Sequence, residues 1–263
     1  MCDSCGGEWR RAMPAAAAIE LWLTAGDVFD EIEDQDEPGL WLNVGIAQAT
    51  NAAIALLFLS QQAVFRLGSQ GYSESAVLEI ARTLGDYGLR STFGQHRDLV
   101  NESLADVSEE DYIEMTGQRS GSLAAAACKV GAILADSRKE VLTAYELAGR
   151  NIGICAQIMN DVRSFSEGSF GKSDVARHKK TLPLIFAVAH AEGEDRTTLL
   201  EENRNRIAEG DDGRRVAGVL DRVGAFDYSL IVANIYAQRA VNALETAGAK
   251  QEFVKVMKEL LAV

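Results

Sequence analysis

The chain has 263 residues, of which 47% are hydrophobic and 25% are charged, proportions that are ordinary for a globular protein with a substantial core. Its formal net charge of −13 argues against a nucleic-acid partner, because phosphate backbones are bound by basic surfaces. An acidic protein can still bind a phosphorylated small molecule through divalent cations.

Cysteine usage and hydropathy argue for an ordinary intracellular setting. Cys2 and Cys5 form a single CxxC with no second pair, so no zinc site is expected, and Cys128 and Cys155 lie in apolar stretches typical of a core. No signal peptide opens the chain, and no stretch reaches about 18 uninterrupted apolar residues. We therefore expect a cytoplasmic protein with no transmembrane segment.

The predicted elements are helices throughout. The first spans residues 14–34 and the second residues 43–67, with the break Glu37-Pro38-Gly39 between them. A third helix over residues 73–98 has Ser73 or Ser75 as its N-cap, and Ser108 caps a fourth that continues to residue 135. Later helices are expected at 140–164 and 181–191, followed by three shorter amphipathic helices.

Few signals favour any other architecture. The chain has three prolines and many alanines, a composition that favours long helices over a turn-rich sheet. Neither alternating strand patterns nor internal repeats are evident. The sequence predicts one all-α domain over residues 1–263, a single-domain helical bundle.

Seven carboxylates lie within eleven residues at the end of the first predicted helix, from Asp27 to Glu37. Asp30 and Asp34 are four residues apart and share a helix face, where like charges destabilise a helix by a few tenths of a kcal/mol, roughly. Mg²⁺ gives this clustering a reason, because it binds one or two carboxylates together with water and substrate phosphate. A solvated acidic helix end explains the segment about equally well.

Two further segments are rich in polar groups. Gln157, Asn160, Asp161 and Ser164 end another apolar helix, with Asn160 and Ser164 on one face. The loop that follows is basic, and with Arg119 its cations indicate a bound polyanion in so acidic a chain, although a solvated basic loop is the alternative explanation. These loop cations are Lys172, Arg177, Lys179 and Lys180.

In order along the chain, these segments resemble the motifs of the trans-isoprenyl diphosphate synthases. Residues 30–34 (DEIED) are similar to the first aspartate-rich motif DDxxD, residues 94–99 (GQHRDL) to GQxxDL, and residues 119–123 (RSGSL) to KTGxL. Residues 157–161 (QIMND) are similar to FQxxDD, and residues 171–183 to GK…DxxxxKxTLP. Five collinear motifs are far more specific than any single one.

The resemblance implies a helical bundle in which two metal-binding motifs face each other across a central cavity. It implies three Mg²⁺ ions bound with the diphosphate of an allylic substrate, isopentenyl diphosphate as the second substrate, and a homodimer. The implied metal ligands are Asp30, Glu31, Asp34, Asn160, Asp161 and Ser164. The implied diphosphate-binding residues are Arg119, Ser120, Gln157, Lys172 and Lys179, with Asp30, Asp34, Arg119 and Lys179 acting in catalysis.

Departures from the family pattern leave other functions open. Asn160 and Ser164 replace carboxylates of the second motif, the basic motif GKRxRP and the family's first helices have no counterpart, and Glu37-Pro38-Gly39 stands where an arginine pair is usual. The alternatives are a class I terpene cyclase, whose second metal motif also begins N-D-x-x-S, an enzyme that prenylates another acceptor, and a catalytically reduced partner subunit.

Overall fold

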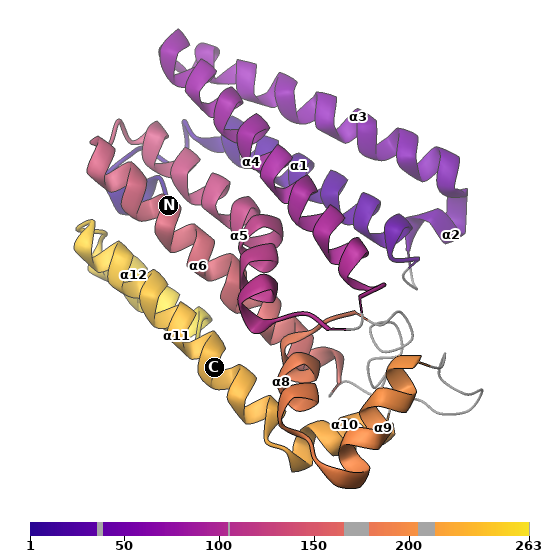
Figure 1. Cartoon of the computed structure of the whole chain (residues 1–263). Coiled ribbons are helices and arrows are strands. Elements are labelled where there is room, and N and C mark those ends of the chain that lie inside the picture. Colours follow the sequence, from indigo (N-terminus) through magenta and orange to yellow (C-terminus); the bar gives the residue numbers. More distant parts are fainter. Residues whose placement is uncertain (36–38, 105, 166–178, 205–213, 263) are drawn as a thin grey trace. The chain divides into compact units, whose positions relative to one another are not determined.

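The computed structural model describes residues 1–35, 39–104, 106–165, 179–204 and 214–262, without the side chains of residues 201–204 (Figure 1). All regular elements in these ranges are helices, which confirms the predicted all-α class. The longer ones are α1 (Met13–Glu33), α3 (Ile46–Phe65), α4 (Glu74–Asn101), α5 (Glu109–Leu134), α6 (Lys139–Ser164) and α11 (Ala225–Thr246). The shorter ones are η1 (Asp3–Cys5), α2 (Leu40–Val44), η2 (Arg66–Gln70), α8 (Leu182–His190), α9 (Gly193–Arg204), α10 (Arg214–Arg222) and α12 (Gln251–Leu260).

Local capping signals were predicted correctly. Ser73 Oγ accepts the Ala76 N–H at 3.2 Å before α4, and Ser108 Oγ accepts the Asp111 N–H at 3.1 Å before α5. Both hydroxyls satisfy backbone donors that the first helical turn cannot use. The capping residue and the turn it caps are neighbours in sequence, so the pattern is readable without the fold.

Two boundary predictions were wrong. The expected helix over residues 43–67 is divided at Gly45, whose φ of 83° is a left-handed value that an L-residue rarely adopts. The last third of the described chain holds four helices, α9 to α12, in place of three short ones, and α11 has 22 residues. The turn expected at residues 211–213 lies outside the described residues.

The chain forms two compact units, one of residues 1–86 with 126–145 and the other of residues 87–125 with 146–263. The single-domain expectation stays a prediction. In the first unit, α1 packs on α3 around Val28, Ala49 and Ala53. Ser60 Oγ donates a hydrogen bond to the Ala18 carbonyl at 2.7 Å, which ties the two helices together. Small side chains on α3 let the helix backbones approach closely.

The segment Ile46–Gln70, which comprises α3 and η2, is the one helix in the described ranges that is long and apolar enough to cross a membrane. Only 28% of its most apolar window is buried, and Ile54, Phe58 and Phe65 are exposed. This is weak evidence for a membrane span, because a core helix of a water-soluble protein meets the same criteria. The expected absence of a transmembrane segment stays a prediction.

The second unit has two apolar clusters and helices that cross at very short distances. A cluster around Ile154, Ile158 and Leu182 joins α5, α6, α8 and α11, and another around Leu220 joins α8 to α11. A Cβ built on Gly153 would lie 2.3 Å from the Ser120 carbonyl oxygen. Glycine is therefore required where α6 crosses α5, and this contact sets the distance between the polar side chains on the two helices.

Candidate active site

A buried carboxylate organises the polar side chains of the second unit. Asp161, on α6, is 5% exposed. Its Oδ2 accepts hydrogen bonds from the Tyr112 hydroxyl at 2.6 Å and from the Leu182 backbone N–H at 3.2 Å, while Oδ1 accepts one from Gln157 Nε2 at 3.0 Å. A buried carboxylate is costly unless it is hydrogen-bonded, and these three donors supply that compensation.

The orientation of Gln157 is determined on both sides. Its Oε1 accepts a hydrogen bond from Ser120 Oγ at 2.8 Å, and its Nε2 donates to Asp161. The chain from Ser120 through Gln157 to Asp161 therefore connects α5 with α6. Ser120 and Gln157, two of the five predicted diphosphate-binding residues, lie in this network, and the close glycine contact between the helices keeps them within reach of each other.

A second carboxylate brings two predicted cations together. Asp98 Oδ2 lies 2.8 Å from Arg119 Nη1 and 3.8 Å from Lys179 Nζ, and the Asp98 side chain is 6% exposed. These three residues come from α4, α5 and the segment before α8. The pairing therefore brings two cationic side chains to the same carboxylate oxygen.

Burial changes the pKa of two residues beside these groups. It raises the pKa of the Tyr112 hydroxyl well above its ordinary value, and the Asp161 carboxylate adds to the effect. Tyr112 is therefore a neutral donor to Asp161 at any physiological pH. Burial lowers the pKa of Lys180, next to Lys179, although the carboxylates of Asp106 and Glu102 act in the opposite direction.

The first acidic motif lies in the other unit, at the end of α1. Asp34 is the C-cap of α1 and is 1% exposed, and its N–H donates to the Asp30 carbonyl at 2.7 Å. Glu31 Oε2 accepts the Leu40 N–H at 2.9 Å, so this carboxylate holds the start of α2. Desolvation, with the charges of Asp30, Glu31 and Glu20, raises the pKa of Asp27. An arrangement of the two motifs across a cavity stays a prediction.

The remaining predicted residues have different surroundings. Asn160 is exposed at the end of α6, whereas Ser164 Oγ donates to the Asp161 backbone carbonyl at 2.8 Å. Lys172, with Gly171 and Arg177 of the basic loop, lies outside the described residues. Among the site residues that the sequence interpretation did not name are Asp98 and Tyr112. Asp98 was at least visible inside the GQxxDL segment, but nothing in the sequence singled out Tyr112.

The chemistry of the acidic side chains fits a hard divalent cation. In the described ranges, no three His, Cys, Asp or Glu side chains come close enough to enclose an ion by themselves. Mg²⁺ does not need such an enclosure, because it keeps several waters and binds substrate phosphates beside one or two carboxylates. Asp30 and Asp34 can supply carboxylate oxygens of the kind that Mg²⁺ binds. In Asp161, by contrast, at least three of the roughly four acceptor positions already accept hydrogen bonds.

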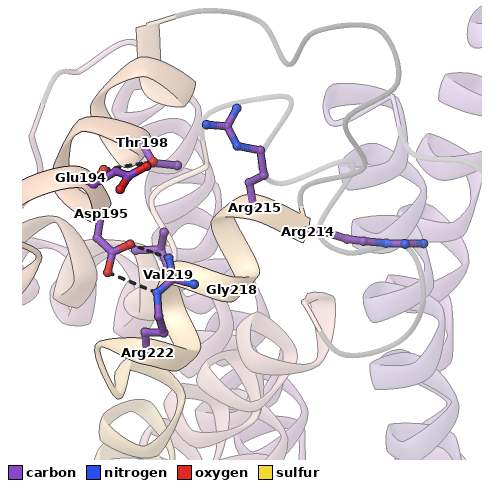
Figure 2. A pocket seen from close by; sticks show the side chains of 8 residues that line it. All are labelled: Glu194, Asp195, Thr198, Arg214, Arg215, Gly218, Val219 and Arg222. Carbon is purple, nitrogen blue, oxygen red and sulfur yellow. Dashed lines mark hydrogen bonds and ion pairs between the residues drawn. The ribbon is translucent and has the colours of Figure 1, made fainter.

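A pocket of 460 Å³ lies between α9 and α10. Figure 2 shows Arg222 directed at Asp195, with which it forms an ion pair, whereas Arg214 extends away from that pair. Acidic and basic side chains line the pocket together, and none of the predicted site residues is among them. The polar network of the second unit is therefore the better candidate site.

Comparison with known proteins decides the family. Residues 1–219 match the polyprenyl synthetase family. The chain belongs to the polyprenyl synthetase family. A short chain isoprenyl diphosphate synthase of Methanothermobacter thermautotrophicus is 32% identical over 256 residues, which cover 92% of this chain and 76% of that protein. The resemblance inferred from the five motifs is confirmed.

Two further similarities bear on fold and chemistry. A polyprenyl synthetase of Streptomyces coelicolor A3(2) has the same fold, with a TM-score of 0.87 over 100% of this chain and 82% of that one, at 22% identity. The tryptophan prenyltransferase ComQ of Bacillus subtilis is 26% identical over 93% of this chain and 78% of its own length. This polyprenyl synthetase is accordingly a prenyltransferase of the isoprenyl diphosphate synthase type.

Proposed function

We propose that this polyprenyl synthetase condenses an allylic prenyl diphosphate with isopentenyl diphosphate, and that Arg119 and Lys179 bind the allylic diphosphate. The observation that carries the assignment of these two residues is their shared contact with the buried Asp98. The shared carboxylate holds two cationic side chains next to each other. Such a group suits a ligand whose negative charge grows as the reaction proceeds.

The reaction requires that an allylic C–O bond break with its electron pair leaving on the diphosphate. Arg119 and Lys179 stabilise the departing anion, and Ser120 and Gln157 orient it through their fixed hydrogen bonds. The double bond of isopentenyl diphosphate then forms the new C–C bond, and a proton is lost to the released diphosphate. Apolar walls must exclude water while the cation exists.

We propose Mg²⁺, three ions in all, as the cofactor. When bound, it neutralises charge on the diphosphate. Asp30 and Asp34 would hold it from the first motif, and Asn160 from the second, with Lys172 adding to the diphosphate-binding cations. Glu31 and Ser164 are weaker candidates, because the carboxylate of the first accepts the Leu40 N–H and the hydroxyl of the second donates to its own helix.

The test is product formation from farnesyl diphosphate and labelled isopentenyl diphosphate with Mg²⁺. A synthase consumes both diphosphates and gives a longer prenyl diphosphate. Hydrocarbon made without isopentenyl diphosphate would instead indicate a cyclase, prenylation of an added indole acceptor would indicate a ComQ-like activity, and a need for a second protein would indicate a reduced subunit. The comparisons do not favour these three alternatives.

Lys179→Ala tests the residue assignment. It should raise the KM for farnesyl diphosphate by at least tenfold, because a charge-assisted contact is lost. The matched control is Lys258→Ala, which removes the same charge from an exposed pair with Glu245 on α11 and α12. Equal KM values for the two variants would contradict the role of Lys179.

We also propose that the protein is a cytoplasmic homodimer, with the exposed apolar side chains of α3 in the interface. Phe58 and Phe65 are 60% and 62% exposed, and a second copy would cover such side chains. Sedimentation should give about twice the mass of 28.4 kDa, and Phe58→Glu should reduce it to the monomer. A monomeric wild type would contradict the proposal.

A further inference from the structure

The first turn of α8 is held by a side chain from another helix. Thr181 is the N-cap of α8, but its hydroxyl makes no capping bond and has no partner among the described residues. Leu182 is the first residue of the helix, and its N–H donates a hydrogen bond to Asp161 Oδ2 at 3.2 Å. A carboxylate at this position also interacts favourably with the helix dipole. Asp161 therefore supplies the cap that Thr181 does not.

Tyr112 connects this cap to α5. Its hydroxyl is fully buried and donates to the same oxygen of Asp161 at 2.6 Å, the length of a charge-assisted O–H···O⁻ bond. One carboxylate oxygen thus joins a side chain of α5 to the backbone of α8. Lys179 lies three residues before Leu182, and its Nζ lies 3.8 Å from Asp98 Oδ2.

We propose that Tyr112 is a positioning residue for the diphosphate-binding cations. Through Asp161 it fixes the start of α8, and this fixes Lys179 beside Arg119 and Asp98. The inference rests on the proposed function of Lys179 as a diphosphate ligand. It gives Asp161 a structural task that requires no metal, and the predicted metal-ligand role of Asp161 is a separate question.

Tyr112→Phe is the informative variant, because it removes one hydroxyl and keeps the ring. Tyr228→Phe is its matched control, since the Tyr228 hydroxyl donates to a carboxylate, Glu109 Oε2, at the same 2.6 Å in the same unit but outside the network. Two quantities are measured in each variant. They are the hydrogen exchange rate of the Leu182 amide in ¹⁵N-leucine-labelled protein, and the KM and kcat for farnesyl diphosphate.

The Leu182 amide reports on the cap directly. As the first residue of a helix it has no intrahelical acceptor, so its protection depends on Asp161. In Tyr112→Phe we expect its exchange to be faster by about tenfold and the KM to rise by about tenfold, as for loss of a hydrogen bond to a buried charge. The kcat should change by less than about twofold, because the reacting atoms are untouched. Tyr228→Phe should leave all three quantities at wild-type values.

Three results are decisive. Unchanged Leu182 exchange and KM in Tyr112→Phe would overturn the proposal, as would equal effects in the two tyrosine variants. A wild type that forms no product while Leu182 exchange still responds to Tyr112→Phe would refute the proposed function and support the capping role. If Tyr112→Phe does not fold, the exchange rate of the Leu182 amide in Asp161→Asn tests the cap, because an amide has one acceptor oxygen for the donors that now share two, and an unchanged rate would overturn the proposal.

Discussion

Gly94→Ala should destabilise the protein because α4 and α5 are in backbone contact at this point. A Cβ on Gly94 would lie 2.3 Å from the Arg119 nitrogen and 2.7 Å from its Cα. Ordinary contacts begin at 3.4 Å, so the two helices would have to separate by roughly 1 Å. Neither obstructing atom belongs to a flexible side chain. The helices must move, and the Arg119–Asp98 ion pair spans the same interface.

Gly85→Ala is the matched control in the same helix. Gly85 is exposed, and a Cβ there would meet nothing within 4 Å. Alanine is favoured over glycine in a helix by about 0.5–1 kcal/mol, a gain that both variants share. The difference between them is therefore the cost of overpacking, about 1–3 kcal/mol, and it should lie near the upper end because backbone is displaced.

Thermal and urea unfolding of the two variants measure this difference. Gly85→Ala should unfold at or above the wild-type Tm, and Gly94→Ala should unfold lower, by about 2–4 °C for each kcal/mol. Gly94→Ala should also raise the KM for farnesyl diphosphate, because it separates Arg119 from Asp98. The reasoning would be refuted if Gly94→Ala were as stable as Gly85→Ala.

Three other predictions follow from single residues. Asp30→Asn should weaken activation by Mg²⁺, so that a higher Mg²⁺ concentration is needed for half-maximal rate while the circular dichroism spectrum stays unchanged. If the rate depended on Mg²⁺ concentration as in the wild type, the ligand role of Asp30 would be contradicted. At pH 8, Ellman's reagent should react quickly with Cys5 alone, because the other three cysteines are buried and burial raises the pKa of Cys128 to about 12; rapid reaction of all four would refute this burial. The hydrogen bond to Glu109 and burial raise the pKa of the Tyr228 hydroxyl to about 12. The hydroxyl therefore contributes fully to the free energy of unfolding below about pH 10, and this contribution is lost toward pH 12. The difference in unfolding free energy between the wild type and Tyr228→Phe should shrink over that interval.

Much of the fold was predictable because its signals are local. The hydroxyl caps at Ser73 and Ser108 act on backbone groups three residues away, and their helices begin where expected. The break at Gly45 was missed, because a glycine inside an apolar run indicates a left-handed turn only when the flanking helices diverge. The four helices of the last third were undercounted for a related reason. A short amphipathic stretch does not show in the sequence where one helix ends and the next begins.

The family, the all-α class and most of the candidate residues could be predicted from the amino-acid sequence, because five ordered motifs are specific and helix periodicity needs no tertiary context. The contacts that bring these residues together could be read only from the folded chain. Asp98 and Lys179 are 81 positions apart, and Tyr112 and Asp161 are 49 positions apart. Their contacts depend on how closely α4, α5 and α6 pack, and that distance is set by glycines such as Gly94 and Gly153, at positions where any Cβ would meet backbone.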